Sequence, residues 1–410
     1  MAVGIEDLNS YGGRACLDVR TLFRSRGLDL ERFGNLMMER KAVGFPWEDP
    51  VTNGVNAARP IVDRLSAADR GRIELLVTAS ESGIDFGKSL STYVHQHLGL
   101  SRRCRLFEVK QACYGGTAAL QMAASFVASG ASPGAKALVV ATDTARAAAK
   151  LTYAEPSQGT GAAAVLVGEN PEVLDLDFGA NGYWGYEVMD TCRPTAEFET
   201  GDPDLSLLSY LDCLERSWEV YAERVEGADF ADTFDYLGFH TPFGGMVKGA
   251  HRMMMRKLKR AGPAVSDADF ERRVLPSLLH CVEVGNIYSA TLFLALQGIV
   301  DRGDFRAPRR VGLFAYGSGC SSEFFSGSVT SRSQEKLRSL ALADRLRERH
   351  QLTMEEYDRL LDLNASWTFG TKDREMDRGP LAPLYGSHFA GRGLLVLDGI
   401  RNYHREYSWS

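Results

Sequence analysis

Short apolar runs alternate with helical segments in the first part of the chain, and this alternation restricts the fold more than any other feature. The runs cover residues 72–80 (RIELLVTAS), 105–109, 137–142 (ALVVAT) and 161–167 (GAAAVLV). Continuous apolar runs of this length are typical of strands buried on both faces of a parallel sheet. Apolar residues at helical spacing lie between the runs, so the alternation predicts an α/β fold with a mostly parallel sheet.

The second part of the chain predicts similar elements in a less regular order. Residues 170–204 are rich in Gly, Asp, Pro and aromatic residues without periodicity, and they are interpreted as a connection between two halves. A hairpin turn is expected at 317–319 (GSG), between two short strands. Helices are expected here at 205–225, 249–260 and 288–300, and another is expected near the start of the chain at 28–41.

The composition excludes several classes of protein. With 44% hydrophobic and 24% charged residues, the 410-residue chain is an ordinary globular protein. A net charge of −6 argues against nucleic-acid binding, which needs a basic surface. No apolar run approaches the roughly 20 residues of a membrane span. The seven cysteines form no C-x-x-C pair, which favours a reduced, cytoplasmic compartment and no metal site.

Cys113 lies where a strand gives way to a helix, and it is the candidate nucleophile. Gly115 and Gly116 follow it and allow another group to approach the backbone closely. The unpaired N–H groups and the positive end of a helix would stabilise a thiolate at this position. The alternative is a buried thiol at the start of a core helix.

Other small-residue turns each present one reactive side chain: Glu81, His240 and Asn286. Each also has an ordinary interpretation. Glu81 could be a helix-start carboxylate, His240 a hydrogen-bonded structural residue, and Asn286 a helix cap. Together with Cys113 they supply every role that carbon–carbon bond formation on a thioester requires, which favours the catalytic interpretation.

At this point the sequence resembles the 3-hydroxy-3-methylglutaryl-CoA (HMG-CoA) synthases, and within them the polyketide β-branching HMG-ACP synthases. The motifs, in chain order, are ESGIDFGKSLSTYVH, FEVKQACYGGTAALQMA, ATDTAR, GYEVMDTCRP, FHTPFGGMVKGAHR, GNIYSATLFLAL and YGSGCSSEFFSG. The resemblance implies a thiolase-like fold of five αβαβα layers built from two similar halves, and a homodimer. The halves would be 1–170, with Glu81 and Cys113, and 171–410, with His240 and Asn286.

The resemblance also implies roles for individual residues. Cys113 would carry the acetyl group, Glu81 would be the general base and acid, and His240, held by Asn286, would act on the acceptor. No bound cofactor is implied, because the phosphopantetheine arm of an acyl carrier protein, or CoA, carries the substrate. The oxyanion and substrate-binding residues would be Ser318, Gly317, Ser206 and Tyr153.

Two departures from the family pattern matter, the first for the carrier and the second for what gates the site. Gly245 and Gly249 stand where the primary-metabolism enzymes are expected to have lysines for CoA, which favours donor and acceptor carrier proteins as partners. The segment 143–156 is plainer and shorter than expected of β-branching relatives. Carrier proteins are acidic, so a local cationic patch is needed for docking. Its candidates are Arg32, Lys248, Arg256 and Lys257, although a basic helix face is by default a solvated one.

Three other enzyme types use related residues. The mevalonate-pathway HMG-CoA synthase differs only in the carrier. An initiating ketoacyl synthase uses a Cys-His-Asn triad, but Glu81 argues against it, since decarboxylative condensation needs no base. A thiolase needs a second catalytic cysteine, for which Cys320 is the only suggestive residue. A catalytically silent protein with the same fold is the remaining alternative.

Overall fold

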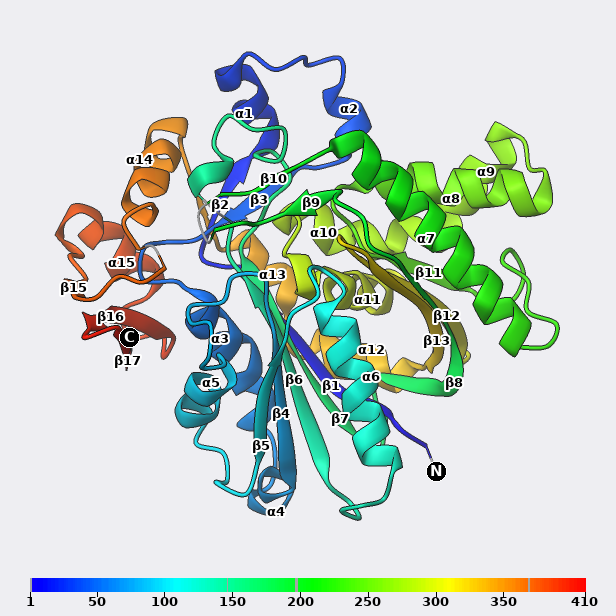
Figure 1. Cartoon of the computed structure of the whole chain (residues 1–410), viewed down its shortest axis with the longest axis horizontal. Helices are drawn as coiled ribbons and strands as arrows, with labels where there is room; N and C mark the ends of the chain where they lie inside the picture. Colours follow the sequence, from blue (N-terminus) through cyan, green and yellow to red (C-terminus); the bar gives the residue numbers. More distant parts are fainter. Residues whose placement is uncertain (1, 146, 196–197, 368) are drawn as a thin grey trace.

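The computed structural model describes residues 2–145, 147–195, 198–367 and 369–410. Its centre is a nine-stranded sheet in the order β11-β12-β13-β8-β1-β7-β6-β4-β5 (Figure 1). Only two residue pairs, Gly4 with Asp175 and Ile5 with Leu174, join β1 to β8, so the sheet consists of two halves that meet there.

The two halves repeat one arrangement. Four neighbouring strands in each half, β4-β6-β7-β1 and β11-β12-β13-β8, have the same directions: the first pair is parallel and the next two pairs are antiparallel. In the first half β5 extends this set beside β4. The first half contains β1 (Gly4–Tyr11), α3 (Pro50–Val62), β4 (Ile73–Ala79), α5 (Ser91–Leu98), β5 (Arg105–Val109), α6 (Gly115–Ala128), β6 (Lys136–Asp143) and β7 (Gly161–Gly168). The second contains β8 (Leu174–Gly185), α7 (Pro203–Arg224), β11 (Tyr236–Phe239), α8 (Gly244–Lys259), α10 (Leu278–Val284), α11 (Thr291–Arg302), β12 (Arg309–Gly317) and β13 (Ser321–Val329).

Helices separate and cover the two half-sheets, which gives the five-layered thiolase-like fold. A core of small and branched residues lies between the half-sheets, around α6 and α11. The other face of the first half-sheet packs on α3 and α5, and the other face of the second packs on α7 and α8. The predicted α/β architecture of two similar halves is therefore confirmed, whereas the boundary at residues 170 and 171 stays a prediction.

The prediction of a mostly parallel sheet is wrong. Only the pairs β4–β5, β4–β6 and β11–β12 are parallel, and the other neighbours run antiparallel. The apolar runs at β6 and β7 reflect burial under helices on both faces, and such burial does not depend on strand direction.

Two further local predictions fail for physical reasons. Residues 28–41 hold only a short helix, α2 (Phe33–Leu36), because Met37 adopts a left-handed conformation (φ 50°) and the chain then enters β3 (Arg40–Val43). The irregular connection predicted over 170–204 instead begins with β8, a long strand with exposed and glycine positions that pairs with β13. The hairpin at 317–319 and the other three predicted helices are present, as α7, α8 and α11 with its leading turn Tyr288–Ala290.

The end of the chain returns to the first half. Apolar residues of α14 (Met354–Asn364) and β16 (Leu395–Arg401) pack against Phe45 and Trp47. Asn56 of α3 exchanges two hydrogen bonds with the backbone of Leu395, of 2.8 and 3.1 Å. No helix in the described part of the chain is long and apolar enough to cross a membrane. The remaining elements are β2 (Ala15–Asp18), α1 (Val19–Arg26), α4 (Ala67–Gly71), β9 (Thr191–Cys192), β10 (Thr200–Gly201), α9 (Pro263–Asp269), α12 (Ser331–Arg338), α13 (Leu342–Arg347), β14 (His350–Gln351), β15 (Arg374–Glu375), α15 (Ala382–His388) and β17 (His404–Trp409).

Candidate active site

Cys113 lies in the turn between β5 and α6. Ala112, directly before it, has a φ of 44°, which is a strained conformation for a residue with a side chain and is typical of functional turns. A side chain at Gly116 would overlap the carbonyl oxygen of Ser289, so this glycine lets the first turn of α6 lie against the segment that leads into α11. The predicted close approach at this glycine is confirmed, and it brings the two halves together beside the thiol.

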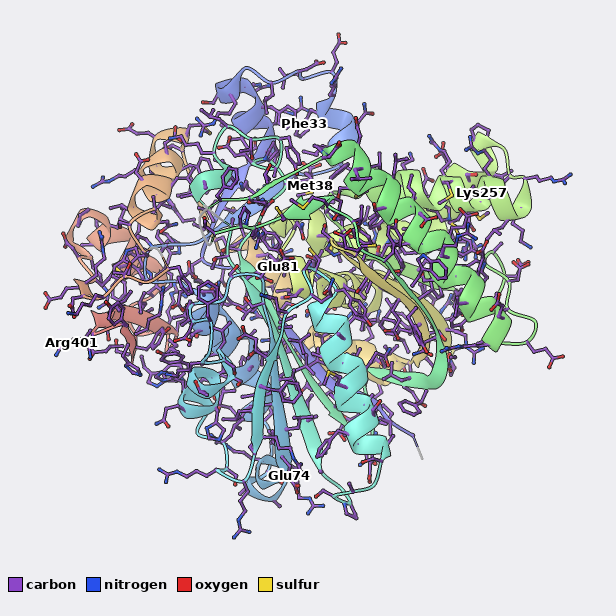
Figure 2. All side chains as sticks on the ribbon, in the orientation of Figure 1. Phe33, Met38, Glu74, Glu81, Lys257 and Arg401 are labelled. Atoms are coloured by element: carbon purple, nitrogen blue, oxygen red, sulfur yellow. The ribbon has the colours of Figure 1, made fainter. Side chains whose placement is uncertain are left out.

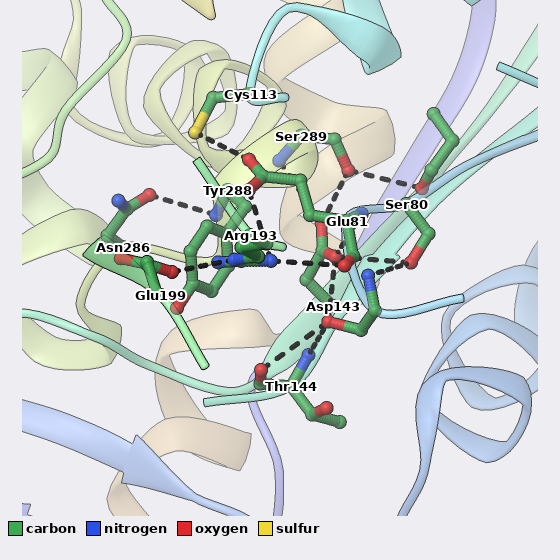
Figure 3. Close-up of polar contacts among 12 residues, drawn as sticks. Ser80, Glu81, Cys113, Asp143, Thr144, Arg193, Glu199, Asn286, Tyr288 and Ser289 are labelled. Atoms are coloured by element: carbon green, nitrogen blue, oxygen red, sulfur yellow. Dashed lines mark hydrogen bonds and ion pairs between the residues drawn. The ribbon is translucent and has the colours of Figure 1, made fainter. Parts of the chain in front are cut away.

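The Glu81 carboxylate lies between the Cys113 thiol and a guanidinium group (Figure 3). The thiol Sγ donates a hydrogen bond of 3.0 Å to Oε1 of Glu81. Oε2 of the same carboxylate lies 3.2 Å from Nη1 of Arg193, which also donates to the main-chain oxygen of Glu81 at 3.0 Å. The two carboxylate oxygens therefore have different partners, a reactive sulfur and a fixed cation.

The surroundings of the Cys113 thiol favour its protonated form. Burial, and then the negative charge of Glu81, raise the pKa of the Cys113 thiol well above its usual range. The thiolate expected from the helix N-terminus is therefore not the resting form, because burial and the neighbouring carboxylate outweigh the helix. Acyl transfer to this sulfur needs a proton acceptor, and Oε1 of Glu81 occupies that position.

Asp143, at the end of β6, ties the Glu81 turn to the second half of the molecule. Its Oδ1 accepts hydrogen bonds from the Glu81 N–H at 2.7 Å and from Ser80 Oγ at 3.1 Å. Its Oδ2 accepts from Ser289 Oγ at 2.7 Å. Burial, with a contribution from the charge of Glu81, raises the pKa of Asp143 to about 7. Asp143 belongs to the ATDTAR motif, whose last residue, Arg146, lies outside the described residues.

His240 follows β11 and is almost fully buried, with 2% of its surface exposed. Burial lowers the pKa of His240 to about 3, so its imidazole is neutral at physiological pH. Its Nδ1 has no hydrogen-bond partner within the described residues. Oδ1 of Asn286 accepts instead from the Tyr288 N–H at 2.9 Å and from Thr291 Oγ1 at 3.0 Å. The expectation that Asn286 holds the His240 ring is therefore wrong for this structure, and Asn286 instead fixes the turn that leads into α11.

One cavity of about 1240 Å³ brings the predicted residues together. Its wall includes Glu81, Cys113, His240, Asn286, Ser318, Ser206 and Tyr153. Gly317 lies behind that wall, where a Cβ atom would be 2.6 Å from the backbone nitrogen of Tyr114. The 317–319 turn and the Cys113 turn are thus in direct contact, as a shared oxyanion site requires.

The predicted docking residues lie in different places. Arg32 is exposed beside α2, and its ion pair with Asp29 is 3.4 Å long. Lys248 lies near the start of α8 and pairs with Asp267 at 3.5 Å. Leu36 of α2 and Met246 of α8 line the cavity, so each cation lies within a few residues of its wall.

Arg256 and Lys257 lie near the other end of α8, Lys257 being about 16 Å along the helix axis from Met246. Figure 2 shows Lys257 at the periphery of the molecule, whereas Glu81 lies near its centre. Lys257 is also paired with Glu215. This part of the predicted docking patch is therefore away from the cavity and partly neutralised.

Sequence reasoning missed Arg193, Asp143 and Glu199. The first two belong to the motifs GYEVMDTCRP and ATDTAR. Asp143 directly follows the apolar run 137–142, so the signal that points to Glu81 is also present there, whereas Arg193 follows no such run. Arg193 lies between Glu81 and Glu199, whose Oε2 is 2.6 Å from its Nε. Among the residues that the structure describes, no group of three or more His, Cys, Asp and Glu side chains could hold a metal ion.

Comparison with known proteins agrees with this geometry. Two family models match the chain, Hydroxymethylglutaryl-coenzyme A synthase N terminal over residues 48–172 and the C-terminal counterpart over residues 251–375. The polyketide biosynthesis 3-hydroxy-3-methylglutaryl-ACP synthase PksG of Bacillus subtilis is 54% identical, covering 100% of this chain and 99% of that protein. The Hydroxymethylglutaryl-CoA synthase of Enterococcus faecalis is 33% identical over 87% of this chain and 91% of its own.

A solved structure extends the comparison to the fold. The HMG synthase of the curacin biosynthetic pathway, in complex with apo donor-ACP, superposes with a TM-score of 0.97 at 56% identity and full coverage of both chains. These similarities span the whole chain and both halves of the fold. The chain therefore belongs to the hydroxymethylglutaryl-CoA synthase family.

Proposed function

We propose that this protein is a 3-hydroxy-3-methylglutaryl-ACP synthase of polyketide β-branching. It condenses an acetyl thioester with the β-ketone of a second thioester. The observation that carries the proposal is the hydrogen bond between Cys113 Sγ and Glu81 Oε1, on the wall of a cavity that His240 also lines. The 54% identity to PksG, against 33% to the Enterococcus enzyme, supports the carrier-protein form of the reaction.

In the first step Cys113 takes the acetyl group from a donor carrier protein. Sγ attacks the thioester carbonyl while its proton passes to Oε1 of Glu81. The carbonyl carbon forms a bond to Sγ and loses its bond to the pantetheine sulfur, which leaves with the proton. Glu81 is then again a base, and the phosphopantetheine arm is a substrate carrier rather than a resident cofactor.

In the second step Glu81 removes a proton from the methyl group of the acetyl-enzyme. The N–H groups of Cys113 and Ser318 stabilise the enolate oxygen, and the enolate carbon adds to the β-ketone of the acceptor. Neutral His240 donates a hydrogen bond to the developing alkoxide, which receives the proton that Glu81 removed from the methyl group, so Glu81 is again a base. Water then hydrolyses the thioester to Cys113 and releases the branched product on the acceptor carrier protein.

The region beside the pocket mouth favours carrier proteins over CoA. Gly245 stands where a lysine is expected in the CoA-dependent enzymes, and a side chain there would overlap the carbonyl oxygen of Asn35. The backbone around α2 thus occupies the space that a side chain at this position would need, whereas the space at Gly249 is open. Arg32 and Lys248, each within a few residues of the cavity wall, are the proposed contacts with an acidic carrier protein. The mevalonate-pathway HMG-CoA synthase remains the alternative.

A homodimer and a cytoplasmic location complete the proposal. β5 is the outer strand of the sheet, with half-buried Leu106, Phe107 and Val109, and Phe86 beside it is 92% exposed. An outer strand of this kind offers unpaired backbone groups to a second copy. All seven cysteines are free, which fits a reducing compartment. Light scattering coupled to size-exclusion chromatography measures the oligomeric state directly.

The carrier preference is tested by comparing donors. The protein is incubated with acetyl-CoA or with an acetyl-loaded donor carrier protein, each with an acetoacetyl-loaded acceptor carrier protein. Mass spectrometry of the acceptor measures the formation of its 3-hydroxy-3-methylglutaryl form. The proposal expects faster turnover with the carrier-bound donor, and faster turnover with acetyl-CoA would favour the mevalonate alternative.

A further inference from the structure

Arg193 reaches the active site from a segment that is far from Glu81 in sequence and contributes none of the predicted catalytic residues. Its guanidinium contacts Glu81 twice, at the side chain and at the main chain, and contacts Glu199 from the other side. It also lies over the ring of Tyr288, with 5.0 Å between its Cζ and the ring centroid. Only 14% of its side chain is exposed, so these contacts form away from bulk water.

The segment that carries Arg193 is fixed on both sides. Thr191 and Cys192 of β9 pair with Gly201 and Thr200 of β10. Asp190, just before β9, accepts hydrogen bonds from Tyr316 Oη at 2.7 Å and from the Gly319 N–H at 2.9 Å. Arg193 is therefore anchored to the 317–319 turn, which also carries Ser318.

The fixed guanidinium has a direct consequence for the base. A carboxylate on a flexible Glu side chain can rotate, so either oxygen could face the sulfur. With Oε2 held by Arg193, Oε1 stays on Cys113 Sγ, and the planar guanidinium group restricts both the position and the plane of the carboxylate. Misplacement of a catalytic group by about 1 Å can cost about 100-fold in rate.

We propose that Arg193 is a positioning residue for Glu81: it keeps one carboxylate oxygen on the reacting sulfur and supplies the cation that offsets the acidic groups around it. The proposal rests on the proposed function, in which Glu81 is the base. Arg193 itself touches no reacting atom and acts through Glu81.

The charged and titratable groups around Arg193 come from every element packed on it. Three carboxylates come from the turn after β4, the end of β6 and the loop before β10. A thiol comes from the turn before α6, and a phenol comes from the segment before α11. These groups are Glu81, Asp143, Glu199, Cys113 and Tyr288. Burial opposes the charge of Arg193, but the surrounding acidic groups leave its pKa raised, so it stays a cation throughout the pH range of an assay. Without it, the remaining carboxylates would compete for protons at higher pH.

The test compares Arg193→Met, Arg193→Lys and Arg378→Met with the wild-type protein. Arg378 is the matched control, because it also pairs with a carboxylate (Asp398) and lies over a tyrosine ring (Tyr385), outside the cavity. The rate of acetyl transfer from an acetyl-loaded carrier protein is measured by intact mass at a series of pH values. Thermal unfolding of each variant shows whether the protein is folded.

We expect Arg193→Met to lower the rate of acetyl transfer about tenfold at neutral pH, which is no more than the loss expected on removal of the Glu81 carboxylate, and to move the acid limb of the pH profile up by about one unit. Arg193→Lys should recover the wild-type acid limb, because it restores the charge, and Arg378→Met should match the wild type in both. A folded Arg193→Met variant with the wild-type rate and pH profile would overturn the proposal. If Arg193→Met does not fold, the pH profiles of Arg193→Lys and Glu199→Gln test the proposal instead. Removal of the negative charge of Glu199 should not raise the acid limb, so an upward shift of the acid limb in Glu199→Gln would contradict the charge argument. Failure of the wild-type protein itself to accept acetyl would refute the proposed function instead.

Discussion

Replacing Glu81 with glutamine separates the two steps of the proposed reaction. Glutamine keeps the size of the side chain but cannot take a proton from the acetyl methyl group. A positioned general base contributes about 10²–10⁴-fold in rate. At about 1.4 kcal/mol for each factor of ten, condensation should lose about 3–5 kcal/mol of transition-state stabilisation.

Acetyl transfer to Cys113 should suffer less. The substitution removes the acceptor that lies 3.0 Å from Sγ, but it also removes a negative charge that raises the pKa of the thiol. A change of one unit in a pKa corresponds to a factor of ten in the thiolate population. Because the two effects oppose each other, we expect acetyl transfer to fall about tenfold, which is well short of the loss in condensation.

The assay is rapid quench followed by intact-mass measurement of the enzyme and of the acceptor carrier protein. Acetyl-enzyme should accumulate in Glu81→Gln while the branched product forms very slowly. Thermal unfolding controls for the loss of the ion pair between Arg193 and Glu81, after which Arg193 keeps its pair with Glu199. The reasoning is refuted if Glu81→Gln condenses at the wild-type rate, or if it loses both steps equally.

Four further perturbations test other parts of the account. His240→Ala should accumulate acetyl-enzyme. In the wild-type protein, burial lowers the pKa of His240 to about 3, so the condensation rate in a stopped assay should show no inflection near pH 6.5. Gly116→Ala should destabilise the protein by about 1–3 kcal/mol in urea unfolding, because the new Cβ atom overlaps backbone atoms. The control is Gly249→Ala in α8, which has open space around it and should be neutral or stabilising. Burial raises the pKa of Glu48 to about 7, so the native state keeps a proton that the unfolded state loses near pH 4.5. The free energy of unfolding should therefore fall as the pH rises from 4.5 to 7, and in urea unfolding Glu48→Gln should remove this pH dependence. Arg32→Glu should raise the KM for an acetyl-loaded carrier protein severalfold and leave the KM for acetyl-pantetheine unchanged, and an equal effect on both would argue against docking at this residue.

The catalytic turns could be predicted from the sequence because their signals are local. Glu81, Cys113 and His240 each follow a short apolar strand and precede small residues, and the structure puts all three on one cavity wall. Gly116 is likewise legible, since a glycine in the first turn of an apolar helix points to a close contact. The direction of the strands left no such signal, because burial under helices produces the same apolar runs in parallel and antiparallel sheets.

The electrostatics of the site could not be predicted, because its partners are distant in sequence. Arg193 and Glu81 are 112 residues apart, and the segment that carries Arg193 has no periodicity. The thiol of Cys113 was expected to be acidic from its place before a helix, but its pKa depends on burial and on carboxylates from other strands. The basic face of α8 is likewise partly paired with Glu215 and Asp267, which belong to other segments of the chain.

The central claim is that the sulfur of Cys113 carries the two-carbon unit while Glu81 acts on it. The most direct measurement is peptide-level mass spectrometry of the protein after incubation with an acetyl-loaded donor carrier protein, with and without an acetoacetyl-loaded acceptor. The account predicts one acetyl group, on Cys113 and on none of the other six cysteines, that disappears when the acceptor is added as the branched product forms. An unmodified Cys113, or an acetyl group that the acceptor does not remove, would contradict it.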